Sequence, residues 1–137
     1  MAHALVTGAS RGIGRATAIA LSARGDRVAV HYGNDRDSAA ETLALLHGDG
    51  HHLVGGDLSD PTAAAAIVDE AIAALGVIDV LVNNAAIAPS SATFHRVDAV
   101  DYATWQDAWT RMLDVDLRAA ANVSYLVANA LIRAGAG

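Results

Sequence analysis

Short apolar runs alternate along the chain with longer segments in which apolar residues recur at helical spacing. The short runs predict strands at residues 4–7, 28–32, 52–55 and 78–82. The longer segments predict helices at residues 12–24, 38–48, 60–76 and 101–132, with a surface loop over 86–100 that holds Pro89, Ser90 and Ser91. A strict strand–helix alternation predicts a Rossmann-like α/β fold, a doubly wound parallel sheet with helices on both faces.

Capping residues refine the helix boundaries. Ser38 and Glu41 have the spacing of a capping box, which predicts Ser38 as the N-cap of the second helix. Asp60 followed by Pro61 predicts the start of the third helix. The apolar face predicted to pack inward on the first helix carries Ile13, Ala16, Ala20 and Ala23.

Composition narrows the class of protein. The chain has 137 residues, which predicts one domain, and 53% of them are hydrophobic while only 4% are aromatic. The net charge is −6 and no basic run occurs, so a nucleic-acid surface is not expected. There is no cysteine, which excludes disulfides and thiolate chemistry. No signal-peptide pattern or apolar run of membrane-spanning length is present, so we expect a cytoplasmic protein with no membrane partner.

A glycine-rich turn joins the first predicted strand to the first helix. It reads Thr7-Gly8-Ala9-Ser10-Arg11-Gly12-Ile13-Gly14. A strand, a glycine turn and a helix N-terminus in this order bind a dinucleotide pyrophosphate, because the helix start presents free N–H groups and glycine lets the phosphates approach the main chain. The spacing differs from Gly-x-Gly-x-x-Gly, and the alternative is a turn that only connects strand to helix.

Four motifs together resemble the short-chain dehydrogenase/reductase family. Residues 7–14 resemble its Thr-Gly-x-x-x-Gly-x-Gly motif, and Asn83-Asn84-Ala85-Ala86 resembles its Asn-Asn-Ala-Gly motif. Asp57-Leu58 resembles the adenine-contacting Asp motif, and residues 113–118 resemble the segment around the family's helix asparagine. The motifs occur in the family's order and cover nearly the whole chain.

The resemblance implies a set of coenzyme-binding residues. Gly8, Gly12 and Gly14 would shape the pyrophosphate site and Asp57 would contact the adenine ring. Asn83 would tie the fourth strand to its neighbours, and Ala85 would line the pocket. The full expected set is Thr7, Gly8, Ser10, Arg11, Gly12, Ile13, Gly14, Tyr32, Asn34, Asp57, Leu58, Asn83 and Ala85. The alternatives are a solvated turn charge at Asp57 and a simple turn at Asn83 and Asn84.

The end of the second strand bears on the choice between NAD(H) and NADP(H). An acidic residue that binds the ribose 2′-hydroxyl is expected about 20 residues after the turn. Tyr32 falls there, and neither it nor Gly33 or Asn34 carries a negative charge. Arg11 and Arg36 can pair with a 2′-phosphate, whereas Asp35 and Asp37 weigh against one. We therefore predict NADP(H) as the preferred coenzyme, with NAD(H) as the alternative.

The family's catalytic Ser and Tyr-x-x-x-Lys find no match in this chain. It contains no lysine, so neither Tyr102 nor Tyr125 has a lysine four residues on. The family's helix asparagine, part of its proton relay, corresponds to Asp116. Asp116 is either a relay remnant or a surface charge near Arg118.

The expected function is an NADP(H)-dependent oxidoreductase that transfers hydride between nicotinamide and a small carbonyl/alcohol substrate, with this chain as the cofactor-binding half and inactive by itself. The alternative is a non-catalytic dinucleotide-binding module or a degenerate remnant. The fold that the family implies would here have strand order 3-2-1-4, with the fourth strand as an open edge. We therefore expect marginal stability and a homo-oligomer or pairing with a second chain. No metal site is expected, because His51 and His52 would face opposite sides of a strand.

Overall fold

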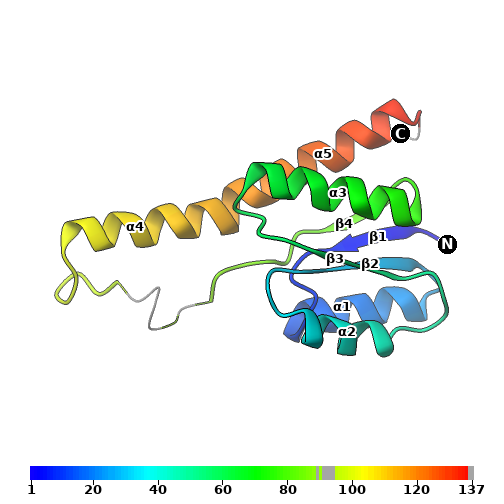
Figure 1. Ribbon diagram of the computed structural model, residues 1–137, viewed down its shortest axis with the longest axis horizontal. Helices are drawn as coiled ribbons and strands as arrows, with labels where there is room; N and C mark the ends of the chain where they lie inside the picture. The colour runs from blue at the N-terminus through cyan, green and yellow to red at the C-terminus, as the bar shows by residue number, and fades with distance from the viewer. Residues whose placement is uncertain (89, 91–94, 136–137) are drawn as a thin grey trace.

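Four parallel strands form one sheet in the computed structural model, which describes residues 1–88, 90 and 95–135. The strand order is β3-β2-β1-β4 (Figure 1). The strands are β1 (His3–Val6), β2 (Arg27–Tyr32), β3 (His52–Gly55) and β4 (Val80–Val82). This topology confirms the predicted Rossmann-like fold class and the expected order 3-2-1-4.

Helices cover both faces of the sheet. α1 (Gly12–Ala23) and α2 (Arg36–Ala44) lie on one face, and α3 (Pro61–Leu75) and α5 (Ala119–Arg133) on the other (Figure 1). α4 (Tyr102–Leu113) extends away from the sheet and runs through a π-helical turn, η1 (Asp114–Arg118), into α5. Over the described ranges, no helix combines the length and apolarity needed to cross a membrane.

β1 is the centre of the sheet and separates two cores. Its Leu5 pairs with Ala29 of β2 and with Leu81 of β4. Leu5 points into the core that α3 and α5 cover, which also holds Ile67 and Val123. The neighbouring β1 residues point into the second core beneath α1 and α2. Because all four strands are parallel, their carboxyl ends meet at one edge of the sheet, where ligands bind in folds of this kind.

The predicted start of the second helix was wrong. The N-cap of α2 is Asp35, whose Oδ1 accepts a hydrogen bond from the Ser38 amide at 3.0 Å. The Ser38 hydroxyl donates to the other Asp35 oxygen at 2.8 Å, so Ser38 lies inside the first turn. Asp caps a helix as well as Ser does, and here it starts the helix earlier. The same helix ends at Ala44, before the predicted stop at Gly48.

The fourth strand is shorter than predicted, beginning at Val80 rather than at residue 78. The Asp79 amide donates to the His3 carbonyl at 2.8 Å, but the His3 amide donates to the Asp79 carboxylate at 2.9 Å, so regular pairing starts two residues after the predicted start. Ile78 is still buried, at 1% exposure.

The predicted inward face of the first helix was also wrong. The buried residues of α1 are Gly14, Ala18 and Ser22, while Ile13 is 79% exposed. Alanines recur on both faces of this helix, so the apolar pattern could not distinguish them. Small side chains at the contact allow the helix backbone to lie close to the sheet.

A matched pair of isoleucines tests the position of the core. Ile67→Ala on α3 removes a side chain that is 1% exposed and should lower the free energy of unfolding by about 2–5 kcal/mol. Ile132→Ala on α5 removes one that is 75% exposed and should change it by less than about 0.5 kcal/mol. Urea unfolding followed by circular dichroism measures both values, and equal losses would contradict this assignment of the core.

Candidate functional site

The glycine turn between β1 and α1 is held by close packing at two of its glycines. Gly8 has a φ of +62°, and a Cβ there would lie 2.8 Å from the Ala85 Cα. A Cβ on Gly14 would lie 2.3 Å from the Gly8 carbonyl oxygen and 2.5 Å from the Asn84 Nδ2. Gly12, with a φ of +56°, meets no atom within 4 Å of its Cβ position. The turn is therefore tightly packed at both ends and open in the middle.

The N-terminus of α1 has no side-chain cap. Its N-cap residue is Arg11, which is extended and makes no capping hydrogen bond. The other helices that start from a described loop are capped by the carboxylates of Asp35, Asp60 and Asp101. The first amides of α1 thus lack the acceptor that their counterparts have, and the helix dipole adds partial positive charge there. This arrangement suits an anionic ligand, with Ser10 and the exposed Ile13 beside it.

Thr7 joins the ends of β1 and β4. Its hydroxyl oxygen accepts hydrogen bonds from the amides of Asn84 at 2.9 Å and Ala85 at 3.0 Å. The hydroxyl itself donates to the Val82 carbonyl at 3.3 Å, and the side chain is buried. One buried hydroxyl therefore continues the contact between the two strands beyond the sheet.

The two asparagines after β4 hold different neighbours. The Asn84 side-chain amide donates to the carbonyl oxygens of Thr7 at 2.9 Å and Gly8 at 3.0 Å. The Asn83 side-chain amide donates to the Ser124 hydroxyl on α5 at 2.9 Å. The sequence prediction gave the tie between strands to Asn83, whereas Asn84 makes the contact with β1 and its turn. Ala85 lies against Gly8, on the same side of the turn.

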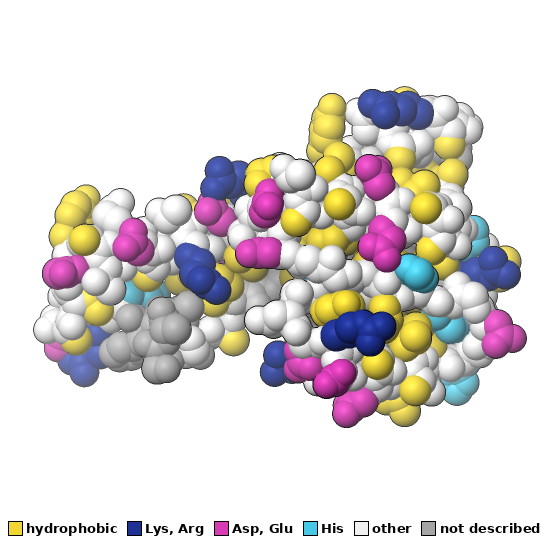
Figure 2. Space-filling view, viewed as in Figure 1, with side chains coloured by type: hydrophobic (Ala, Val, Ile, Leu, Met, Phe, Trp, Pro, Cys, Tyr) yellow, Lys and Arg dark blue, Asp and Glu magenta, His cyan; other side chains and the backbone are white. Residues whose placement is uncertain are grey.

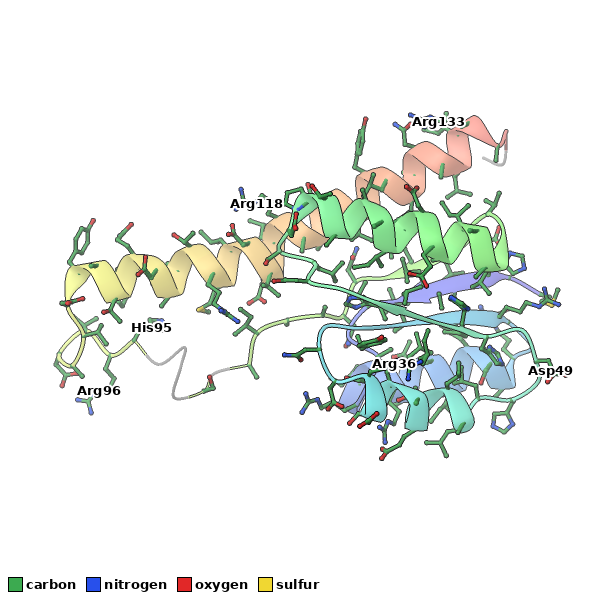
Figure 3. All side chains as sticks on the ribbon, viewed as in Figure 1. Arg36, Asp49, His95, Arg96, Arg118 and Arg133 are labelled. Atoms are coloured by element: carbon green, nitrogen blue, oxygen red, sulfur yellow. The ribbon has the colours of Figure 1, made fainter. Side chains whose placement is uncertain are left out.

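Tyr32 and Asn34 lie at the end of β2. The Tyr32 ring lies over Gly55, where a Cβ would come within 2.5 Å of the ring. Both residues line an open hollow of about 860 Å³, together with Arg36, which is labelled in Figure 3. This hollow gives the end of β2 room for a ligand beside an arginine.

The Arg11 side chain faces Asp35 across the opening of the turn. The distance from Arg11 Nη2 to Asp35 Oδ2 is 3.9 Å, and the Arg11 side chain is 76% exposed. Hydrogen bonds from the Ser38 amide and hydroxyl hold the pKa of Asp35 below its ordinary value, with Arg11 and Arg15 contributing. Asp35 is therefore ionised at neutral pH and neutralises part of the Arg11 charge.

Asp57 and Leu58 follow β3. The Asp57 Oδ1 accepts hydrogen bonds from the Ser59 amide at 2.9 Å and hydroxyl at 2.7 Å. These bonds, the hydroxyl first, lower the pKa of Asp57, and the charge of Arg111 adds to the effect. Leu58 is 5% exposed and belongs to the core, so its side chain is turned away from any ligand.

Asp116 lies on the π-helical turn and reaches the segment after β4. Its Oδ1 accepts a hydrogen bond from the Ile87 amide at 2.8 Å. Arg118 pairs with Asp114 and not with Asp116. Asp116 is exposed, so the relay remnant and the surface charge near Arg118 both stay predictions, while its hydrogen bond connects η1 with the chain leaving β4. Pro89 and Ser91 of the predicted loop lie outside the described residues.

The adjacent residues His51 and His52 do not converge on one point. The His51 Nδ1 accepts from the Val28 amide at 3.1 Å, while the His52 Nε2 lies 3.2 Å from Glu70 on α3. Within the part of the chain that the structure describes, no group of three or more His, Asp or Glu residues could hold a metal ion.

Sequence reasoning missed His31, a β2 residue that contacts the glycine turn. Its Nδ1 lies 3.1 Å from the Gly8 amide nitrogen. A histidine inside an apolar run resembles any other strand residue, so the signal appears only once β1 and β2 are seen side by side.

Comparison with known proteins places this geometry in a family. The family model described as short chain dehydrogenase matches residues 2–137. The chain is 39% identical over 116 residues to a cis-4-hydroxycyclohexanecarboxylate dehydrogenase from Sinomonas cyclohexanicum, covering 83% of this chain and 43% of that protein. It is 35% identical over 136 residues to an L-rhamnose 1-dehydrogenase (NAD(P)(+)) from Sphingomonas sp., covering 97% and 50%.

A solved structure agrees with this match. A short-chain dehydrogenase/reductase from Serratia marcescens superposes with a TM-score of 0.78 at 28% identity, over 93% of this chain and 50% of that one. The chain thus spans about half the length of the relatives that it matches. On its motifs, its topology and these matches, the chain belongs to the short-chain dehydrogenase/reductase family of oxidoreductases.

Proposed function

We propose that this chain is the coenzyme-binding half of an NADP(H)-dependent oxidoreductase that acts on a carbonyl/alcohol pair. The observation that carries the proposal is the uncapped start of α1, which adjoins the open position at Gly12. When bound, the coenzyme supplies a hydride or accepts one from the substrate carbon. The two named relatives are dehydrogenases, and their names indicate a hydroxy acid and a sugar as substrates.

The diphosphate is proposed to bind the main-chain amides at the start of α1. The turn residues Thr7 to Gly14 shape this site, because Gly8 and Gly14 leave no room for a side chain while Gly12 leaves space above the backbone. Asp57 is proposed to accept a hydrogen bond from the adenine amino group. Its ionised carboxylate suits that role. Tyr32 and Asn34 would flank the adenosine ribose. Leu58 would contact the coenzyme only through its backbone atoms. Asn83 and Ala85 would line the nicotinamide side of the site.

The preference for NADP(H) rests on charge at the end of β2. No acid occupies residues 32–34, so nothing there repels a 2′-phosphate. Arg11 is exposed and near the turn, and Arg36 lines the adjacent hollow. Asp35 opposes the preference, but its carboxylate is engaged by Ser38 and faces Arg11. A bound 2′-phosphate would draw Arg11 away from Asp35, since a dianionic phosphate attracts a guanidinium more strongly than one carboxylate does.

Catalysis requires groups that this chain does not contain. It has no lysine for a Tyr-x-x-x-Lys pair, so we propose that it binds coenzyme without turning over substrate by itself. Asp116 is proposed to keep part of the family's asparagine role. Its carboxylate accepts from the Ile87 amide as an asparagine oxygen would, but the ionised group cannot donate in return.

Two charge variants test coenzyme binding and its selectivity. Arg11→Ala should weaken NADPH binding about 10- to 100-fold, as expected for loss of a charge-assisted hydrogen bond, and change NADH binding less than about threefold. Asp35→Asn keeps the N-cap acceptor but removes the charge, and should strengthen NADPH binding about two- to fivefold. Titration of NADPH and NADH fluorescence against the unmodified chain and both variants measures these three changes.

The same titration separates the candidate functions. Equal or tighter binding of NADH by the unmodified chain would contradict the preference for NADP(H), and binding of neither coenzyme would favour a degenerate remnant. Turnover of a panel of ketones by the chain alone would contradict its assignment as a binding half.

We propose that the chain associates with itself or with a second chain through α4 and α5. Large apolar side chains are exposed along these helices and η1. Figure 2 shows apolar side chains at the surface of α4, the helix that extends away from the sheet. They include Trp109, Leu113, Leu117 and Tyr125. An exposed apolar surface of this kind is typical of a protein–protein interface. The β4 edge, which pairs only with β1 among the described strands, adds to the surface that a partner could cover.

Leu117→Glu tests this interface. Leu117 is 64% exposed on η1, so the charge should prevent association without disturbing the core. Leu45→Glu, at 52% exposure on the α2 side of the sheet, is the matched control and should leave association unchanged. Analytical ultracentrifugation should show an oligomer for the unmodified chain and the control and a monomer for Leu117→Glu. A monomeric unmodified chain would contradict the proposal.

A further inference from the structure

His31 is buried beneath the glycine turn, and its ring contacts both the turn after β1 and the turn after β3. It is 2% exposed at the carboxyl end of β2. Its Nδ1 lies 3.1 Å from the Gly8 amide nitrogen, and its Nε2 lies 3.0 Å from the Gly56 carbonyl oxygen. A ring nitrogen facing an N–H must be unprotonated, and one facing a carbonyl must carry a proton. The geometry therefore requires the neutral ring with its proton on Nε2.

The ring extends the sheet beyond the ends of its strands. The Ala9 amide donates to the His31 carbonyl at 2.8 Å, and the Gly56 amide donates to the Tyr32 carbonyl at 3.0 Å. The imidazole adds a bridge from the turn after β1 to the turn after β3. The Gly8 residue is thus held on both sides, its N–H by His31 and its carbonyl by Asn84.

We propose that His31 is a positioning residue for coenzyme binding: its neutral ring fixes the Gly8 peptide and with it the turn that presents the α1 amides, and protonation of the ring releases that peptide. This inference rests on the proposed coenzyme site. A protonated Nδ1 would place a donor against the Gly8 N–H, so one hydrogen bond would become a repulsive contact between two donors. Coenzyme affinity should then fall as the solution is acidified.

Burial favours the neutral ring. Loss of hydration lowers the pKa of His31 below its ordinary value, and the Gly56 carbonyl offsets part of this effect. The ionisable residues on the surrounding elements are Arg11 on the β1 turn, His52 on β3, Asp57 after β3, and Asp69 and Glu70 on α3; His52 is half-buried and the others are exposed. Because the unfolded chain binds the proton at higher pH than the folded chain, this contribution to stability is present above about pH 6.5 and is lost as the pH falls below it.

Isothermal titration calorimetry measures the affinity for NADP⁺ between pH 8 and pH 5.5 and tests the proposal with two variants. His31→Asn keeps an oxygen that can accept from the Gly8 amide and does not titrate in this range, so its affinity should follow only the ionisation of the ligand. His31→Leu accepts nothing and should bind more weakly than the unmodified chain even at pH 8. Relative to His31→Asn, the unmodified chain should lose affinity for NADP⁺ by up to about tenfold for each pH unit below the His31 pKa. A tenfold change per pH unit is the largest that uptake of one proton can cause.

Nitrogen NMR of the ligand-free chain gives a readout that needs neither a variant nor coenzyme. At pH 7.5 the His31 ring should show a protonated Nε2 and an unprotonated Nδ1. A protonated Nδ1 at that pH would overturn the proposal. So would an identical pH profile of NADP⁺ binding for the unmodified chain and His31→Asn. No binding by any of the three proteins at pH 8, with the expected ring state intact, would overturn the proposed function and this inference with it.

Discussion

The contact between Gly14 and the Gly8 peptide is the constraint on which the carboxyl edge of the sheet depends. The first turn of α1 packs directly on the preceding turn, so closely that one methyl group would overlap the Gly8 carbonyl. The Asn84 amide occupies the remaining space and bonds to that carbonyl and to Thr7. The ends of β1 and β4 are therefore tied by part-buried hydrogen bonds and the start of α1 packs against both, so the three form one rigid unit.

This rigid unit explains why the site can attract an anion without a charged side chain at its centre. The other helices that start from described loops satisfy their first amides with a carboxylate, whereas α1 leaves them available. A helix start that is uncapped and held in place is already oriented for phosphate oxygens, so binding need not pay for ordering the loop. Two buried side chains support this unit: the His31 ring nitrogen accepts from the Gly8 amide, and the Thr7 hydroxyl accepts from the Asn84 backbone amide.

Much of the fold could be predicted from the sequence because it follows from local patterns. β1 and β2 stand out in the sequence as short, mostly apolar runs. Asp60 caps the start of α3 and Pro61 is its first residue, so this helix starts by local chemistry alone. The inward face of α1 could not be predicted, because alanine lies on both faces and only the packing against the sheet decides between them. The π-helical turn inside the last helical region has no local signature.

The candidate site divides in the same way. The glycine positions were evident from their order between a strand and a helix. The partners of Asn83 and Asn84 were not, since adjacent asparagines point to different neighbours and only the three-dimensional structure shows that Asn84 contacts β1. His31 was missed for a related reason, because its significance lies in a residue 23 positions away in the sequence.

The most direct test of this account is a crystal structure of the chain grown with NADP⁺. The account predicts that the diphosphate oxygens lie within hydrogen-bonding distance of the main-chain amides at the start of α1, above Gly12. A diphosphate bound elsewhere on the chain, or a side chain filling the space above Gly12, would contradict it.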